Sequence, residues 1–454
     1  MSETIAVQII IPVHNAASTI IETVQSALRQ QSCPTRTIEV HVCCFDDGST
    51  DDSWERLQSL LEKEDDDDDD DDDDSTTPVD TMMLPSTLHL QRHEISRGAG
   101  YARNRAVELY ASSQPTILCW LDADDLMMPT RVAEQVDYLL SLSNDDEQSR
   151  TLLGCHFTRH PPDATWHYTQ WANALSEERL WLEQFREVTI IQPTWMMWKS
   201  RFQELLGGYI EAPLLPEDPL PVHPMVDPTF ETRQTLRLAE DLRFFYTHLQ
   251  HDGLLKILPK PLVVYRHVPG RSQSSATPRK LLLRIRVGIF SQSILRQSWN
   301  VGTDEKNLPN YFGIWGAGRD GKDFYKALTP ELQARVYCFA DVDDRKIIHI
   351  QHYRNIPIVH FSLLAHNEET RKQLYQAWCE QEESSSSARV GRIDKGRPSS
   401  STKTVTREST EPPLKKQKLA YLADSKTRHD SVVTNTRRRL CGHVSNERCP
   451  RTKC

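Results

Sequence analysis

The stretch that decides the fold runs from Thr116 to Asp125 and reads TILCWLDADD. Its first residues are continuously apolar, as in a strand that is buried on both faces of a parallel sheet. Such a strand carries charge only at its tip, where water or a cation reaches it. The oxygens of Asp122, Asp124 and Asp125 suit a hard divalent cation that also binds a phosphate group. An acidic turn with an aspartate capping the next helix is the alternative.

Strands and helices alternate on both sides of this stretch. This alternation predicts an α/β fold with a mostly parallel sheet. Before the acidic cluster, strands are expected over 8–13, 38–45, 88–90 and 116–121, and helices over 17–30, 52–62 and 98–110. After it, helices are expected over 129–142, 236–249 and 280–299, and a strand over 254–264.

Charge is distributed very unevenly along the 454 residues, whose net charge is -10. Asp65–Asp74 is an unbroken acidic run, so 65–80 is predicted to be a disordered insertion in a surface loop. Residues 381–454 hold 17 Lys and Arg against 8 Asp and Glu and are predicted to be a disordered basic tail. A solvated tail is favoured over a nucleic-acid-binding arm, so nucleic acid is not an expected partner.

A second, smaller domain is predicted over 308–378, after a first domain over 5–300. It contains Gly316-x-Gly318-x-x-Gly321 between an expected strand (311–315) and a helix, and Asp341 follows Gly321 by 20 residues. That spacing is typical of a Rossmann-like β-α-β unit that binds a nucleotide. Two interpretations stay open, a second nucleotide or phosphate site and a structural remnant.

The sequence gives no sign of a membrane protein. The first residues lack a basic and apolar leader, and no stretch reaches the roughly 18 apolar residues that a span needs. We therefore expect a cytoplasmic protein with free thiols and no membrane span. The basic patch Pro412–Lys418 leaves a nuclear location open.

Polar motifs also follow the other expected strands, where ligands of parallel sheets bind. They are Pro12-Val13-His14-Asn15, Asp46-Asp47-Gly48-Ser49-Thr50-Asp51 and, at a helix start, Arg97-Gly98-Ala99-Gly100-Tyr101-Ala102-Arg103-Asn104-Arg105. With the acidic cluster, and in this order, they resemble the inverting glycosyltransferases of family 2, which have the GT-A fold. The resemblance covers about residues 5–270.

The resemblance implies a nucleoside-diphosphate sugar donor and a Mn²⁺ or Mg²⁺ cofactor. Asp124 and Asp125 would contact the metal, although which aspartate of the cluster does so stays open. The chain has Ser96 where the family has Asn, and Ala106 where it has Gly. The implied donor-binding residues are Pro12, His14, Asn15, Asp46, Asp47, Arg97, Arg103 and Asp122.

The resemblance also implies a catalytic base near the start of a helix. Glu240-Asp241 matches this position, which makes Asp241 the base and Glu240 a supporting or acceptor-binding group. In isolation the pair would read as ordinary helix-capping carboxylates.

The function expected from these residues is transfer of a sugar to a hydroxyl of a glycan or another acceptor. Segments 155–175, 193–195 and 240–249 resemble an N-acetylglucosaminyltransferase-like branch of the family, which implies UDP-N-acetylglucosamine as donor and galactose as acceptor. Two alternatives belong to other classes. One is an oxidoreductase that uses the glycine motif at 316–321, and the other is a scaffold or nucleic-acid-binding protein that acts through its basic tail.

Overall fold

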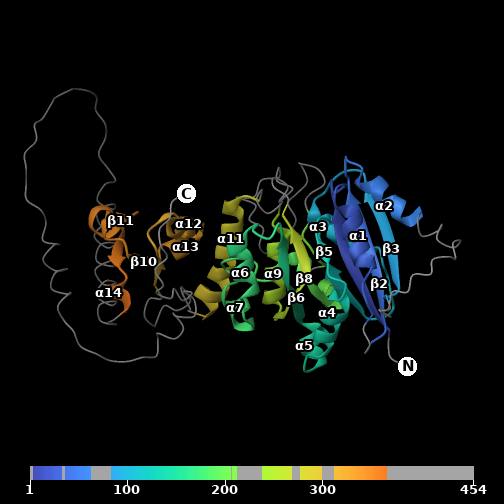
Figure 1. The fold of residues 1–454 in the computed structure, drawn as a ribbon. Coiled ribbons are helices and arrows are strands. Elements are labelled where there is room, and N and C mark those ends of the chain that lie inside the picture. Colours follow the sequence, from blue (N-terminus) through green and yellow to red (C-terminus); the bar gives the residue numbers. More distant parts are fainter. Residues whose placement is uncertain are drawn as a thin grey trace, which may run out of the picture. The chain divides into compact units, whose positions relative to one another are not determined.

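The chain forms two compact units, Met1–Asn310 with Lys322–Arg335 and Tyr311–Gly321 with Val336–Cys454 (Figure 1). The computed structural model describes residues 4–32, 36–62, 83–205, 207–211, 238–267, 277–298 and 311–365. The predicted acidic insertion at 65–80 and the predicted tail at 381–454 both lie outside the described residues.

The first unit is built on an eight-stranded sheet with the order β3-β2-β1-β4-β7-β6-β8-β5. Neighbouring strands are parallel from β3 to β4, and β6 is parallel to β8, while β7 and β5 run against their neighbours. The strands are β1 Ile5–Val13, β2 Ile38–Asp47, β3 Ser86–His93, β4 Thr116–Trp120, β5 Leu126–Met127, β6 Thr151–His160, β7 Met196–Trp198 and β8 Leu254–Arg266.

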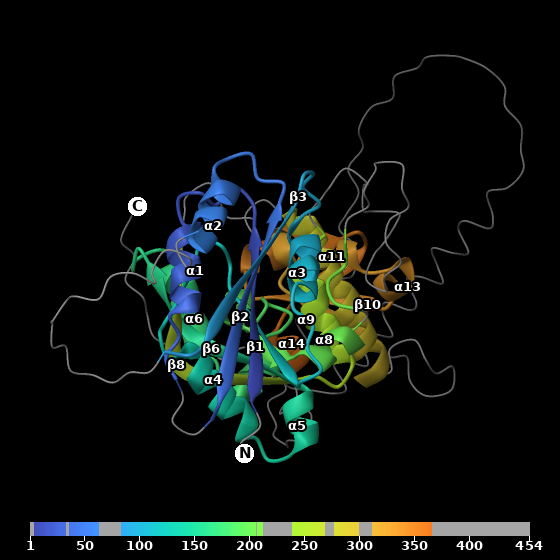
Figure 2. The same cartoon turned by 90° about the vertical axis from the view of Figure 1, so that its right-hand side faces the viewer.

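Helices cover both faces of this sheet, which explains why β4 is entirely buried and is apolar at every position after Thr116. Figure 2 shows α1, α2 and α4 on one face and α3, α8 and α9 on the other. The helices of this unit are α1 Ile20–Leu28, α2 Ser53–Glu62, α3 Ala99–Glu108, α4 Arg131–Leu140, α5 Asp145–Ser149, α6 Trp166–Asn173, α7 Glu177–Leu182, α8 Lys199–Glu204, α9 Glu240–Gln250 and α11 Arg279–Phe290, with η1 Gln192–Thr194 and η2 Ser291–Ser298.

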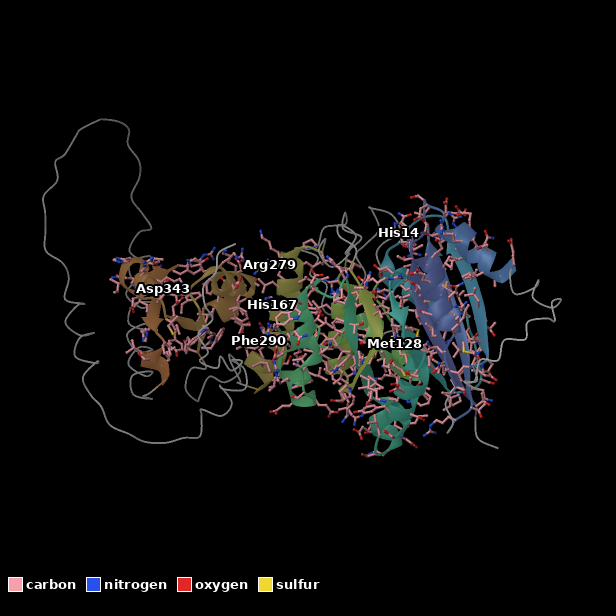
Figure 3. The ribbon with its side chains drawn as sticks, viewed as in Figure 1. His14, Met128, His167, Arg279, Phe290 and Asp343 are labelled. Carbon is pink, nitrogen blue, oxygen red and sulfur yellow. The ribbon has the colours of Figure 1, made fainter. Side chains whose placement is uncertain are left out.

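The carboxyl ends of six strands meet at one edge of the sheet. β1 to β4 are parallel, and two antiparallel steps through β7 return β6 and β8 to the same direction. His14, which is labelled in Figure 3, follows β1 at this edge. The motifs that end the strands are therefore gathered on one side of the unit, as expected for a parallel sheet.

The second unit contains a four-stranded sheet with the order β11-β12-β10-β9. β9, β10 and β12 are parallel, and β11 runs against β12. The described elements of this unit are β9 Phe312–Trp315, β10 Val336–Asp341, η3 Lys346–Ile350, β11 His352–Tyr353, β12 Ile356–His360 and α14 Ser362–Ala365. The helix α12 Arg319–Ala327 begins in this unit, while its remaining residues and α13 Pro330–Gln333 belong to the first unit. The predicted α/β class, a mostly parallel sheet beside a second and smaller one, is confirmed.

None of the described helices combines the length and the apolar character needed to cross a membrane.

Candidate active site

The ends of β1 and β2 are tied together by hydrogen bonds. The ring Nδ1 of His14 lies 2.9 Å from the carbonyl oxygen of Asp47. Asn15, with a φ of 54°, donates its backbone N–H to Ser49 Oγ at 2.9 Å and accepts from Thr50 N at 2.8 Å. Pro12 is in register with Phe45 of β2. These residues form one continuous rim at the edge of the sheet.

The two aspartates that end β2 have different surroundings. Asp47 accepts hydrogen bonds from the backbone N–H groups of Arg97 (2.9 Å) and Gly98 (2.7 Å) and from Ser96 Oγ (2.9 Å), so its carboxylate orders the loop before α3. Asp46 accepts from Ser49 N at 3.0 Å through Oδ1. Its Oδ2 is buried and has no hydrogen-bond partner among the described residues. Asp46 thus has one carboxylate oxygen that accepts no hydrogen bond from the described residues, whereas the carboxylate of Asp47 is hydrogen-bonded to the loop before α3.

Asp122, Asp124 and Asp125 form the acidic cluster, in which one carboxylate oxygen from each lies within 4.8 Å of the others. Asp125 is buried and accepts the backbone N–H of Arg266 at 2.9 Å, because β5 pairs with the end of β8. Its other oxygen is buried without a partner in the described part of the chain. Burial, followed by the charges of Asp124 and Asp122, raises the pKa of Asp125 well above its usual range. A divalent cation would supply the missing partner and offset this repulsion.

Arg103 of α3 connects the acidic cluster to α9. Its guanidinium lies 2.9 Å from Asp122 Oδ1 and 3.0 Å from Glu240 Oε1. Only 6% of the residue is exposed. Burial alone would lower the pKa of Arg103, but the charges of Asp122 and Glu240 raise it above its ordinary value, so the side chain stays cationic. Asp122 and Glu240 are 19 and 137 positions from Arg103 in the sequence, and both are held around its buried charge.

Asp241 follows Glu240 in the first turn of α9 and is half-buried. Burial and the neighbouring charge of Glu240 raise its pKa to about 6, and Arg103 opposes this shift. A carboxylate with that pKa is largely ionised at neutral pH and accepts a proton more readily than an ordinary aspartate. Asp241 thus directly follows the carboxylate that Arg103 joins to the acidic cluster.

A short loop at 207–211 locks α3 against the start of α9. Asn104 accepts the backbone N–H of Tyr209 at 2.9 Å and donates to Tyr209 O at 2.8 Å. Glu211 lies 3.1 Å from Arg105 and 3.5 Å from Arg97. A Cβ at Gly100 would lie 2.7 Å from the carbonyl oxygen of Ile210 and 3.3 Å from Glu240 Cβ, so this close approach requires glycine.

The comparisons with known proteins concern the first part of the chain. The family model described as "Glycosyl transferase family 2" matches residues 8–206. Residues 8–206 belong to glycosyl transferase family 2. This family 2 segment contains β1 to β4, the acidic cluster, β6 and β7. The predicted resemblance to glycosyl transferase family 2 and the predicted GT-A fold class are confirmed.

Individual relatives are more distant. UDP-Glc:alpha-D-GlcNAc-diphosphoundecaprenol beta-1,3-glucosyltransferase WfaP of Escherichia coli is 27% identical over 133 residues, which cover 29% of this chain and 41% of that protein. The chain thus matches about two fifths of that relative's length. Staphylococcus aureus TarS 1–349 in complex with UDP-GlcNAc has a TM-score of 0.39 at 16% identity, covering 74% of this chain and 84% of the other. A Pyrobaculum calidifontis mannosyltransferase in complex with GDP-Man and Mn²⁺ has a TM-score of 0.39 at 18% identity, covering 72% and 73%.

The site also contains three residues to which the sequence analysis assigned no role. Asn104 and Glu211 lock the loop, and Arg266 anchors Asp125 through its backbone and Asp124 O through its side chain. Asn104 stood inside a predicted motif, so only its role was missed. Arg266 ends a predicted strand, which is a signal that could have found it, whereas nothing in the sequence pairs Glu211 with α3.

The glycine motif of the second unit is arranged differently. A Cβ at Gly321 would lie 1.8 Å from Gly316 O, so glycine is required for the tight turn, whereas a Cβ at Gly318 would meet nothing within 4 Å. Asp341 accepts the N–H of Ala317 (2.7 Å), two N–H groups of its own loop and Lys346 Nζ (2.9 Å). Burial raises the pKa of Asp341, but these hydrogen bonds outweigh it and lower the pKa to about 2. The carboxylate that the spacing assigns to a ribose is thus engaged within the protein.

Proposed function

We propose that this chain is an inverting, metal-dependent glycosyltransferase that moves a sugar from a nucleoside diphosphate to an acceptor hydroxyl. The family 2 match supports the class of reaction. The E. coli relative is named for a UDP-glucose donor, which favours UDP over other nucleotides. N-acetylglucosamine is the sugar to test first, because the sequence resemblance points to it.

The observation that carries the proposal is the Arg103 bridge. It holds Asp122, on the donor side, and Glu240, on the acceptor side, at 2.9 and 3.0 Å from one guanidinium. A displacement at a sugar carbon needs a leaving-group site and a base on opposite sides of that carbon, and both must be fixed in position. The bridge supplies this fixed relation between the acidic cluster and Asp241.

The donor would lie along the rim formed by the ends of β1, β2 and β4. In this proposal Asp46, with its buried and unpartnered oxygen, accepts from the base or ribose. Asp47 and Arg97 shape the loop beside the phosphates, and Asp122 and Arg103 orient the donor. Pro12, His14 and Asn15 complete the nucleotide pocket.

Mn²⁺ or Mg²⁺ fits the acidic cluster, where Asp124 and Asp125 would hold it. The fit rests on three carboxylates within 4.8 Å and on the unpartnered buried Oδ2 of Asp125. When bound, the ion stabilises negative charge on the departing diphosphate, an effect worth several kcal/mol. Asp125 also fixes the end of β8, so Asp124 is the better residue for testing the metal.

The proposed reaction is a single displacement. Asp241 accepts the proton of the acceptor hydroxyl as that oxygen forms a bond to the anomeric carbon. The bond from the anomeric carbon to the diphosphate oxygen breaks, and its electron pair leaves with the diphosphate. Attack opposite the leaving group inverts the configuration at this carbon.

The Asp241→Asn variant tests this assignment. We expect transfer to fall by roughly 10²–10⁴-fold, because the amide cannot take the proton. A panel of nucleotide sugars and acceptors, read by release of nucleoside diphosphate with Mn²⁺ present, measures the loss. Thermal stabilisation by UDP and Mn²⁺ should persist, since the donor rim is intact. Near-normal turnover in Asp241→Asn would remove Asp241 from the role of base.

A further inference from the structure

Arg159 is a cation at this edge of the sheet that has no carboxylate partner among the residues that the structure describes. Arg159 is the second-to-last residue of strand β6, at the same edge of the sheet as the ends of β1 and β4. Its guanidinium carbon stacks 3.8 Å from the ring centre of Tyr265. Among the described residues Arg159 forms no ion pair and no hydrogen bond, and its Nε is buried without a partner. Arg159 is half-buried, whereas the fully buried Arg103 and Arg131 of the family 2 segment both donate hydrogen bonds within the protein.

The strand register places this cation close to the acidic cluster. Arg159 and Tyr265 are partners in the parallel pair β6 and β8. Leu126 is the partner of Val264 in the antiparallel pair β5 and β8, so Asp125 comes level with Tyr265. Arg159, Tyr265 and Asp125 thus form a row across three strands, one residue in from the edge where the sugar would react.

A second tyrosine extends this row toward α9. The ring of Tyr168, from α6, lies 6.4 Å from that of Phe157, which precedes Arg159 on the same face of β6. Burial is the largest cause of the raised pKa of Tyr168, and the charge of Glu187 raises this pKa further. Arg159 lowers the pKa, and Asp241 raises it by a smaller amount. Neither the hydroxyl of Tyr168 nor that of Tyr265 has a hydrogen-bond partner within the described ranges.

We propose that Arg159, Tyr168 and Tyr265 form an acceptor subsite that binds an oxyanion, a carboxylate or phosphate, on the acceptor molecule. The subsite combines one cation with two hydroxyl donors, which is the donor set that an oxyanion requires. By strand register Arg159 and Tyr265 lie at the same edge of the sheet as the acidic cluster, and Tyr168 packs against Phe157 beside them. This inference rests on the proposed transferase function and adds the charge of its acceptor.

Matched glycosides test the charge preference directly. The probes are 4-nitrophenyl β-glucoside and 4-nitrophenyl β-glucuronide, which differ only in a CH₂OH or a carboxylate at C6. A second pair, methyl glucoside and its 6-phosphate, tests phosphate. Binding to the full chain saturated with Mg²⁺ and UDP is measured by titration calorimetry. We expect the anionic member of at least one pair to bind roughly 10-fold tighter or more, as a charge-assisted hydrogen bond allows.

Variants locate the preference. Arg159→Gln should abolish it, Arg159→Lys should keep part of it, and Tyr265→Phe should weaken it. The matched control is Arg150→Gln, since Arg150 precedes the opposite end of β6 and pairs with exposed Asp146. This control should leave both the preference and the turnover unchanged.

Each other result overturns the inference. Equal binding of both members of both pairs by the parent protein does so, as does an anionic preference that survives in Arg159→Gln. If Arg159→Gln instead weakens UDP binding and leaves the glycoside preference intact, the oxyanion is the donor diphosphate. Failure of the proposed function looks different, because the parent protein would then show no stabilisation by UDP with Mg²⁺ or Mn²⁺ and no turnover of any nucleotide sugar.

Discussion

Both units place aspartates at the carboxyl end of a parallel strand, next to a turn that opens a helix. In the first unit, Asp46 and Asp125 each keep one buried oxygen without a partner among the described residues. In the second, both oxygens of Asp341 accept hydrogen bonds from the surrounding loop and from Lys346. No buried side-chain polar atom in the described stretch 311–365 lacks a partner.

Under the proposed function, this difference assigns Asp46 and Asp125 to ligand binding and Asp341 to the structure of its own loop. A buried acceptor without a partner costs about 1–3 kcal/mol, so a folded protein retains one where a ligand supplies the bond. The motifs alone look equally suggestive in the two units, because spacing does not report whether a carboxylate is already satisfied. Variants in the two units should therefore have opposite effects on transfer and on stability.

The largest effect on transfer is expected at the acidic cluster. Asp124→Asn should lower turnover by roughly 10³-fold or more, since it removes a charge that would hold the cation, and metal stabilisation is worth several kcal/mol. The measurement is turnover against Mn²⁺ concentration. Exposed Asp163→Asn serves as the control and should behave as the parent does. An unaltered Mn²⁺ dependence in Asp124→Asn would contradict a metal site here.

Removing the bridge should affect both transfer and stability. Arg103→Gln leaves Asp122 and Glu240 without their shared counter-charge, and breaking a buried ion pair costs about 3–5 kcal/mol. Transfer should fall by roughly 10²-fold as the two sides of the site shift. Arg36→Gln breaks the exposed pair with Asp137 and should cost less than about 1 kcal/mol. Equal losses of Tm in Arg103→Gln and Arg36→Gln would show that the Arg103 bridge stabilises the fold no more than an exposed ion pair does.

Alanine substitutions at Gly100 and Gly318 compare how tightly the two motifs are packed. Gly100→Ala would bring a Cβ to 2.7 Å from Ile210 O and should lower transfer by roughly 10-fold, because overpacking costs about 1–3 kcal/mol and moves the start of α9. Gly318→Ala meets nothing within 4 Å and should change neither transfer nor Tm. Assays of both variants at one substrate concentration suffice. A loss of transfer in Gly318→Ala would tie the second unit to the reaction.

Much of the edge could be predicted from sequence, because polar residues that end buried parallel strands must gather there. The acidic cluster was found in this way, whereas Glu240-Asp241, at the start of a helix, was assigned from the family resemblance. By contrast, no strand is predicted over Thr151–His160, since Gly154 and His156 interrupt its apolar pattern. Strand β7 is not predicted either, because it has only three residues. Arg159 was therefore not recognised as a strand-end residue. Its position depends on the pairing of β6 with β8, which the sequence does not encode locally.

The roles of single carboxylates were also beyond the sequence. Asp46 and Asp47 are adjacent and chemically identical, yet Asp47 is bonded to the loop at 96–98 and Asp46 is not. Arg103 could be assigned to the site, but its contact with Glu240 depends on where the chain returns after 137 residues. Such choices are made by long-range packing rather than by local pattern.

The pH dependence of transfer tests the charges around Asp241. Because Asp241, the proposed base, must be ionised, turnover should fall as pH drops through about 6. The like charge of Glu240 raises the pKa of Asp241, so Glu240→Gln should move this acidic limb to lower pH. Glu187→Gln removes a weaker influence of the same sign and should move it less. A shift to higher pH in Glu240→Gln would mean that another group controls the limb.

The smallest effect on transfer is expected at Asp341, where the change should appear in stability instead. Asp341→Asn loses the ion pair with Lys346 at 2.9 Å and weakens the hold on the Ala317 N–H, at a cost of about 1–2 kcal/mol at pH 7. Folding lowers the pKa of Asp341 to about 2, so its stabilisation is present above the unfolded value near 4. It is lost as the pH falls toward 2. The difference in Tm between parent and variant should therefore shrink below about pH 4, while turnover at pH 7 stays unchanged. If turnover falls without any loss of Tm, the carboxylate serves a ligand rather than its own loop, and the contrast between the two units fails.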